Sequence, residues 1–207
     1  MEDPDGRPMQ DVSADTLKLV LAEVLRDLKD YILFYLKAGE KTPVRVLNSQ
    51  WAELREAQRQ TALYYDNVGM AVTIDIGDMN DIHPKNKQEV GRRLALLARA
   101  DTYGERIVCS GPVYQTYRVK GDRVILSFEC ADGGLKTSDG KKMTGFAIAG
   151  IDGKYHWAEA EICGNEIIVS SEMVKHPLTV RYGWGDNPTC NLINGAGLPA
   201  SSFQTLR

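Results

Sequence analysis

The sequence lacks an apolar run long enough to cross a membrane. Its longest one, Tyr31–Leu36, falls far short of the ~20 residues that a spanning helix needs. It also lacks a basic excess, because its 28 acidic residues outnumber its 25 lysines and arginines and give a net charge of -3. Nucleic-acid binders usually carry the opposite charge. The acidic N-terminus, Met1–Gly6, has neither the basic nor the apolar region of a secretory signal. We therefore expect no nucleic-acid or membrane partner, and the localisation stays open.

Cysteine and histidine are scarce and widely spaced. The cysteines are Cys109, Cys130, Cys163 and Cys190. None of them forms a Cys-x-x-Cys pair, and the three histidines are scattered. The sequence thus predicts no metal site and no cofactor. The cysteines fit buried free thiols, or one or two disulfides if the protein is exported.

Hydrophobic periodicity divides the chain into three segments. Residues 1–48 form the first segment, in which apolar residues three or four apart predict an amphipathic helix over residues 15–37. Such a helix either packs on its own domain or contacts a partner or a second copy. Residues 49–105 form the second segment, and residues 106–207 form the third.

The second segment predicts the order helix, strand, loop, helix. Good helix formers follow Trp51, and the apolar run Met70–Ile76 has the low alternation of a strand covered on both faces. Pro84 suits the first position of a second helix. This order is typical of an α/β layered domain.

The third segment changes to a two-residue period. Between Arg123 and Cys130, alternate residues place Val124, Leu126, Phe128 and Cys130 on one face. Further strands are expected over Phe146–Ile151, Tyr155–Ile162, Glu166–Ser170 and Leu178–Trp184, separated by Asp-Gly and Gly-Asn turns. This spacing predicts an antiparallel β-sandwich-like domain without helices. The aromatic residues Tyr155, Trp157, Tyr182 and Trp184 fit either its core or a sugar-stacking platform on one face.

One histidine lies in the loop between the predicted strand and the second helix. His83 follows Asp78 and Asp81 there, at the carboxyl end of a strand, where α/β sheets collect their functional groups. A histidine held by a carboxylate is the general-base half of a Ser-His-Asp arrangement. The alternative is a histidine that only caps the loop.

Two long stretches carry a family resemblance. They are "GMAVTIDIGDMNDIHPKNKQEVGRRLALLARADTYG", preceded by "SQWAELREAQ", and the tail "VRYGWGDNPTCNLINGAGLPASSFQTLR". Both resemble the C-terminal part of the sialate O-acetylesterase family, carbohydrate esterases of the SGNH hydrolase superfamily that are often exported or lysosomal. The resemblance runs from about Ser49 to Arg207. It implies a partial SGNH-type, flavodoxin-like α/β/α layer over residues 49–105 and an acetylated sugar or sialic acid as substrate. It also implies that His83 is the catalytic base.

The sequence departs from that family in two ways. The superfamily's Asp-x-x-His spacing would need an aspartate at Asn80, whereas the aspartates are Asp78 and Asp81. We favour Asp81 as the partner of His83 because it is the nearer one. The nucleophilic Gly-x-Ser motif is absent altogether. Three interpretations follow: an esterase represented here by its histidine-aspartate half, a two-chain esterase whose second chain carries the nucleophile, or a non-catalytic carbohydrate-binding or assembly module. A homo-oligomer is a further possible partner arrangement, because the single predicted strand needs its apolar faces covered.

Overall fold

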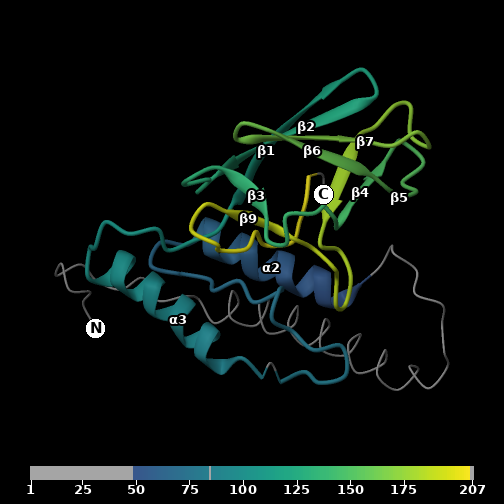
Figure 1. Ribbon diagram of the computed structural model, residues 1–207. Helices are drawn as coiled ribbons and strands as arrows, with labels where there is room; N and C mark the ends of the chain where they lie inside the picture. The colour runs from purple at the N-terminus through teal and green to yellow at the C-terminus, as the bar shows by residue number, and fades with distance from the viewer. Residues whose placement is uncertain (1–48, 84, 206–207) are drawn as a thin grey trace, which may run out of the picture. The chain divides into compact units, whose positions relative to one another are not determined.

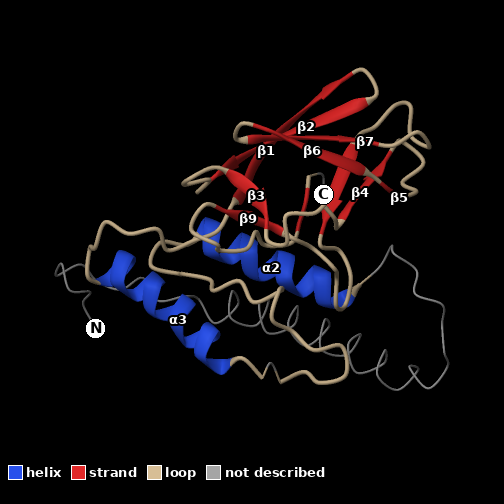
Figure 2. Cartoon of the chain, viewed as in Figure 1, coloured by secondary structure: helices blue, strands red, loops and turns tan. Residues whose placement is uncertain are grey.

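The computed structural model describes residues 49–83 and 85–205, which are mostly antiparallel β-sheet with two α-helices (Figures 1 and 2). The predicted helix of residues 15–37 lies outside the described residues. Within the described ranges, neither helix is long and apolar enough to cross a bilayer.

The first described helix, α2 (Gln50–Tyr64), confirms the helix expected after Trp51. The Ser49 hydroxyl caps it by accepting a hydrogen bond from the Ala52 N–H at 3.0 Å. The same hydroxyl donates to the Asp186 carboxylate at 2.6 Å, which ties the start of the helix to the C-terminal part of the chain.

The second helix, α3 (Lys87–Leu97), begins later than the sequence predicted. Its cap is Asn86, whose side-chain oxygen accepts a hydrogen bond from the Glu89 N–H at 3.0 Å. The described helix therefore starts at Lys87, directly after its Asn86 cap, and the start predicted at Pro84 lies outside the described residues. The helix continues into a π-helical turn, η1 (Ala98–Thr102).

Over its described residues, 106–205, the third segment forms antiparallel sheets without a helix, as predicted. One sheet has the order β1-β2-β7-β6, with β1 (Val113–Lys120), β2 (Arg123–Glu129), β7 (Glu166–Ser170) and β6 (Glu159–Cys163). The other has the order β10-β8-β4-β5, with β10 (Phe203–Gln204), β8 (Thr179–Tyr182), β4 (Phe146–Ala149) and β5 (His156–Trp157). A third, two-stranded sheet joins β3 (Leu135–Thr137) to β9 (Leu192–Asn194).

Both four-stranded sheets contribute to one hydrophobic core. In β2, Val124, Leu126 and Phe128 are buried, as their alternation predicted. Phe203 lies at the centre, with its ring stacked on Tyr114 at a centroid distance of 4.5 Å. Cys130 does not share this face. It is exposed at a φ of 51°, a left-handed conformation that follows the last residue of the strand.

The predicted strand Met70–Ile76 is wrong. The structure has a segment without regular secondary structure there, which ends in a turn in which the Ile76 N–H donates to the Thr73 carbonyl at 3.2 Å. No described strand pairs with it, and a strand exists only where its backbone groups find a ladder partner. In the described residues there is consequently no α/β/α layer, which corrects the fold class expected for residues 49–105.

Candidate functional site

A compact turn precedes α3 and carries the predicted site residues. The Asp81 N–H donates to the Asp78 carbonyl at 3.4 Å, which closes the turn. The Asp78 carboxylate accepts the Asn80 N–H at 3.0 Å. Short aspartate side chains hydrogen-bond readily to backbone groups two residues ahead, so the sequence itself favours this turn.

The structure brings His83 and Asp81 together at the end of this turn. His83 Nδ1 lies 3.1 Å from Asp81 Oδ1, and the His83 backbone N–H donates to the same oxygen at 2.9 Å. An ionised carboxylate can only accept, so Nδ1 must carry the hydrogen in this contact. The lone pair of the neutral ring then lies on Nε2. Both side chains are accessible, with 77% of His83 and 44% of Asp81 exposed.

The second candidate carboxylate, Asp78, faces a different partner. Its Oδ2 lies 3.1 Å from Lys85 Nζ. The hydrogen bond from the Asn80 N–H and the contact with Lys85 lower the pKa of Asp78. The carboxylate next to His83 is therefore Asp81, and Asp78 stabilises the turn.

No nucleophile accompanies the pair in the part of the chain that the structure describes. There, the only side chain hydrogen-bonded to the His83 ring is that of Asp81. Ser110 lies in the loop before β1, and its hydroxyl donates to the Gly111 carbonyl at 3.1 Å. It is not at a strand-to-helix elbow of the kind that presents a nucleophilic serine.

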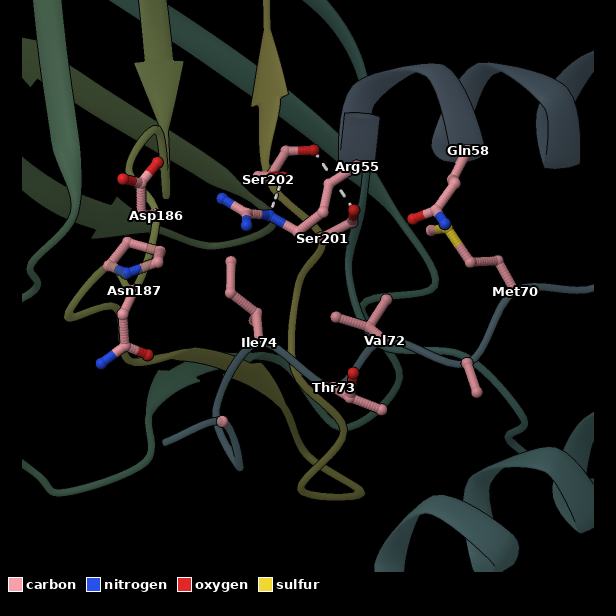
Figure 3. Close-up of a pocket in the computed structure, with 13 residues that line it drawn as sticks. Arg55, Gln58, Met70, Val72, Thr73, Ile74, Asp186, Asn187, Ser201 and Ser202 are labelled. Carbon is pink, nitrogen blue, oxygen red and sulfur yellow. Dashed lines mark hydrogen bonds between the residues drawn. The ribbon is translucent and has the colours of Figure 1, made fainter. Parts of the chain in front are cut away.

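A cavity of about 180 Å³ lies beside the segment that leads to the turn (Figure 3). Its polar lining comes mainly from α2 and from the C-terminal loops, and Val72 and Ile74 line it from the segment before the turn. Arg55 is anchored at one side, where its Nη2 donates to the Gly185 carbonyl at 2.5 Å and to the Gly183 carbonyl at 3.1 Å. Burial lowers the pKa of Arg55. The cavity was not predicted from the sequence, because its lining residues are far apart in the chain.

The four aromatic residues considered as core or platform differ in their exposure. Tyr182 and Trp184 are buried, with 1% and 9% of their surface exposed, and Tyr155 is half-buried. Trp157 is 64% exposed. Arg181 connects the group, since its guanidinium carbon lies 4.0 Å from the Tyr155 ring centroid and 4.7 Å from that of Trp184.

Metal ligands do not gather in the described ranges. Within residues 49–83 and 85–205, no three histidine, cysteine or carboxylate side chains are grouped so as to hold a metal ion. All four cysteines are free thiols in this structure. Burial raises the pKa of Cys190 to about 11, so this thiol is protonated at neutral pH.

The comparisons with known proteins link these features to carbohydrate esterases. No family model and no curated protein matches the chain. A solved structure, that of a carbohydrate acetylesterase from Xanthomonas citri, matches at 46% sequence identity with a TM-score of 0.75. The match covers 77% of this chain and 37% of that one, so the chain spans well under half of the length of the acetylesterase. The chain is therefore similar, in sequence and in fold, to one part of a carbohydrate acetylesterase.

Proposed function

We propose that this chain supplies the general-base part of a carbohydrate O-acetylesterase of the sialate O-acetylesterase type. The observation that carries the proposal is the 3.1 Å contact between His83 Nδ1 and Asp81 Oδ1. It supports a tautomer in which Nε2 can accept a proton, which is the form that a general base needs. The similarity to a carbohydrate acetylesterase supports an acetylated sugar as the substrate.

In this proposal the reaction has two steps. A serine hydroxyl, supplied from outside this sequence, attacks the acetyl carbonyl while His83 Nε2 takes its proton. The imidazolium then gives that proton to the departing sugar oxygen, which leaves an acetyl-serine. A water molecule next attacks the acetyl group, again with His83 as the base, and acetate and the free serine result. Asp81 fixes the ring orientation and stabilises the imidazolium.

A second candidate function is a non-catalytic carbohydrate-binding or assembly module. Two observations favour it: the sequence has no Gly-x-Ser motif, and His83 is 77% exposed. A base without a nucleophile and an oxyanion hole contributes little rate acceleration by itself. Both candidates therefore predict that the isolated chain is nearly inactive, and they differ once a nucleophile is supplied.

The deciding experiment grafts residues 49–205 onto the Xanthomonas acetylesterase in place of the matching part. Acetate release from an acetylated sugar is measured for the graft and for His83→Ala, Asp81→Asn and Asp78→Asn in it. We expect an active graft, in which loss of His83 lowers kcat on the order of 10³-fold. We expect Asp81→Asn to lower kcat strongly as well and Asp78→Asn, the matched control, to have little effect. An inactive but folded graft favours the binding module.

A graft that is active but unaffected by His83→Ala refutes the role of His83. The ungrafted chain gives an independent check with a simple acetyl ester. Fast hydrolysis by that chain would mean that it contains a nucleophile of its own, and serine-directed labelling would then identify it.

A further inference from the structure

The sheet that contains β5 has one face in the core and one face turned away from it. The hydrogen-bonded register places Trp157 opposite Ala147, Ala147 opposite Arg181, and Arg181 opposite Gln204, in one row across the sheet. Tyr155, just before β5, reaches the same face, because the guanidinium of Arg181 lies over its ring at 4.0 Å. The neighbouring rows put Phe146, Ile148, Val180, Tyr182 and Phe203 into the core on the other side.

Trp157 is unusual in this setting. It is 64% exposed on an edge strand of two residues, although tryptophan is highly buried on average. Its row neighbour Ala147 is small and buried, so the sheet beside the indole carries no bulky side chain at that position. In the described part of the chain, no cation lies over the Trp157 ring, whereas Arg181 covers Tyr155 and Trp184.

Polar side chains precede and follow Trp157 along the chain, although Glu159 already belongs to β6 in the other four-stranded sheet. On one side, Glu159 points away from the core, because Ala158 and Ala160 pack against the core and bracket it, and it forms an ion pair with Lys142. On the other side, Arg181 lies over Tyr155 at 4.0 Å. The exposed indole of Trp157 is therefore followed, two residues later, by a carboxylate paired with an ammonium, and preceded by a tyrosine ring that carries a guanidinium.

We propose that Trp157 and the side chains around it, Lys142, Tyr155, Glu159 and Arg181, bind a pyranose ring of a glycan. The inference rests on the proposed function in one respect, namely that the ligand is a carbohydrate. A pyranose has an apolar C–H side that stacks on an indole and a rim of hydroxyls that hydrogen-bond to charged groups. It fits this combination better than a lipid or an apolar peptide does, because those would bury the charged groups without hydrogen-bond partners.

The test measures sugar binding rather than hydrolysis. The chain is titrated with two acetyl-ester-free probes, xylohexaose and sialyllactose, at millimolar concentrations, and the indole N–H signals of its three tryptophans are followed by NMR. We expect at least one probe to shift the Trp157 signal. The Trp157→Phe variant assigns the Trp157 signal.

Variants then locate the site. Trp157→Ala should weaken binding of that probe by about tenfold or more, the loss expected for one stacked ring, and Trp157→Phe should weaken it less. The matched control is Ile151→Ala, which removes a side chain that is 94% exposed in the turn between β4 and β5 and should leave binding unchanged. The far-UV circular dichroism spectrum of each variant shows whether it is folded.

Two results would overturn the proposal. One is the absence of a Trp157 shift with either probe, and the other is binding that survives Trp157→Ala in the folded variant. Because the probes carry no acetyl ester and no nucleophile is needed, these results are independent of the esterase experiment. An active graft with no sugar binding at Trp157 refutes this site alone, whereas binding at Trp157 in an inactive graft refutes the esterase alone.

Discussion

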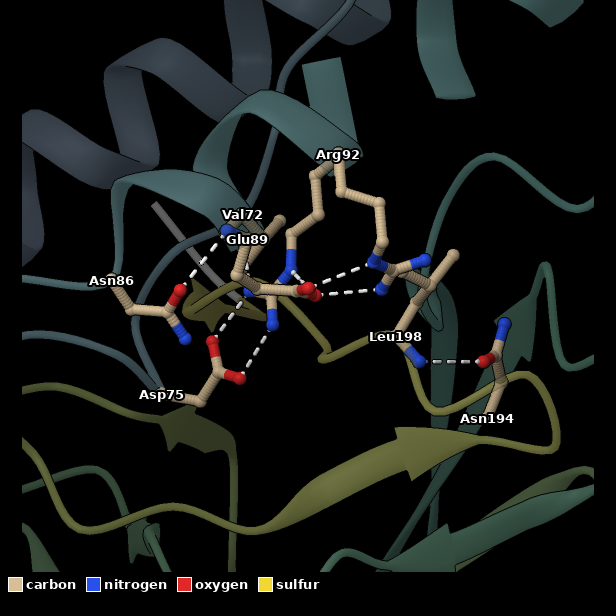
Figure 4. A network of polar contacts seen from close by, with 8 residues as sticks. Val72, Asp75, Asn86, Glu89, Arg92, Asn194 and Leu198 are labelled. Atoms are coloured by element: carbon tan, nitrogen blue, oxygen red, sulfur yellow. Dashed lines mark hydrogen bonds and ion pairs between the residues drawn. The ribbon is translucent and has the colours of Figure 1, made fainter. Parts of the chain in front are cut away.

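Replacing Arg93 with methionine should destabilise the segment before the proposed base. Arg93 lies on α3, and only 6% of its side chain is exposed. Its Nη1 and Nη2 donate to the Asp75 carboxylate at 2.6 and 2.7 Å, and its Nε donates to Glu89 at 2.8 Å (Figure 4). Nη1 also donates to the Val72 carbonyl at 2.5 Å. One guanidinium thus holds the segment that leads to His83 against α3.

The loss of unfolding free energy in Arg93→Met depends on the groups that the arginine leaves without a partner. Removing one partner of a fully buried ion pair costs about 3–5 kcal/mol, because the other charge is left uncompensated. Here the remaining carboxylates can take up water, since 32% of Asp75 and 22% of Glu89 are exposed. The Val72 carbonyl also loses its donor. We therefore expect Arg93→Met to lower the free energy of unfolding by about 2–3 kcal/mol, somewhat below the fully buried case.

Urea denaturation of the wild type and of two variants checks this estimate. The control is Arg99→Met, which breaks an exposed pair with Glu105 whose side chains are 51% and 42% exposed. Exposed pairs contribute about 0–1 kcal/mol. Equal losses in the two variants would refute the reasoning, because they would mean that burial of Arg93 adds nothing. Burial alone would lower the pKa of Arg93, but its bonds to Asp75 and Glu89 raise it, which agrees with a net favourable network.

Two further predictions concern the packing and the acid stability of the chain. Asn194 is fully buried and forms three hydrogen bonds to backbone groups. Asn194→Ala should therefore lower the free energy of unfolding by about 2–4 kcal/mol. Urea denaturation measures this loss, with Asn187→Ala at an exposed site as the control. The second prediction concerns Glu89, whose hydrogen bonds to Arg92 and Arg93 lower the pKa of its carboxyl group from 4.5 to about 2. A carboxylate with a lowered pKa stabilises the fold fully above pH 4.5 and loses this effect as the pH falls towards 2. Thermal melts should therefore show a smaller loss of Tm between these pH values for Glu89→Gln than for the wild type, and parallel curves would contradict the prediction.

The sequence predicted best what depends on neighbouring residues. The alternation in β2 predicted its buried face, and the composition after Trp51 predicted α2. The contact between Asp81 and His83 also spans only two residues, so the order of the residues in the turn was enough to propose it. Local periodicity and short-range hydrogen bonds are encoded in consecutive residues.

Features that depend on distant partners were missed. The strands β3, β9 and β10 have two or three residues each, too few for a periodic signal, and they exist because a partner far along the chain pairs with them. The cavity beside Arg55 and the contact of Arg93 with Asp75 likewise join separate parts of the chain.

The start of α3 was misjudged for a different, local reason. The side chain of Asn86 caps the helix by accepting a hydrogen bond from the Glu89 N–H, three residues ahead.

The wrongly predicted strand Met70–Ile76 and the missing Gly-x-Ser motif have a common physical explanation under the proposed function. Met70–Ile76 has the apolar composition of a strand covered on both sides, yet the described residues offer it no ladder partner. Arg93 bonds one of its carbonyls, that of Val72, in place of a strand. A polypeptide that paired with this segment would complete its hydrogen bonds and would also stand next to the turn that carries His83. One polypeptide can therefore both pair with this segment and supply the serine. The graft onto a longer acetylesterase provides such a polypeptide.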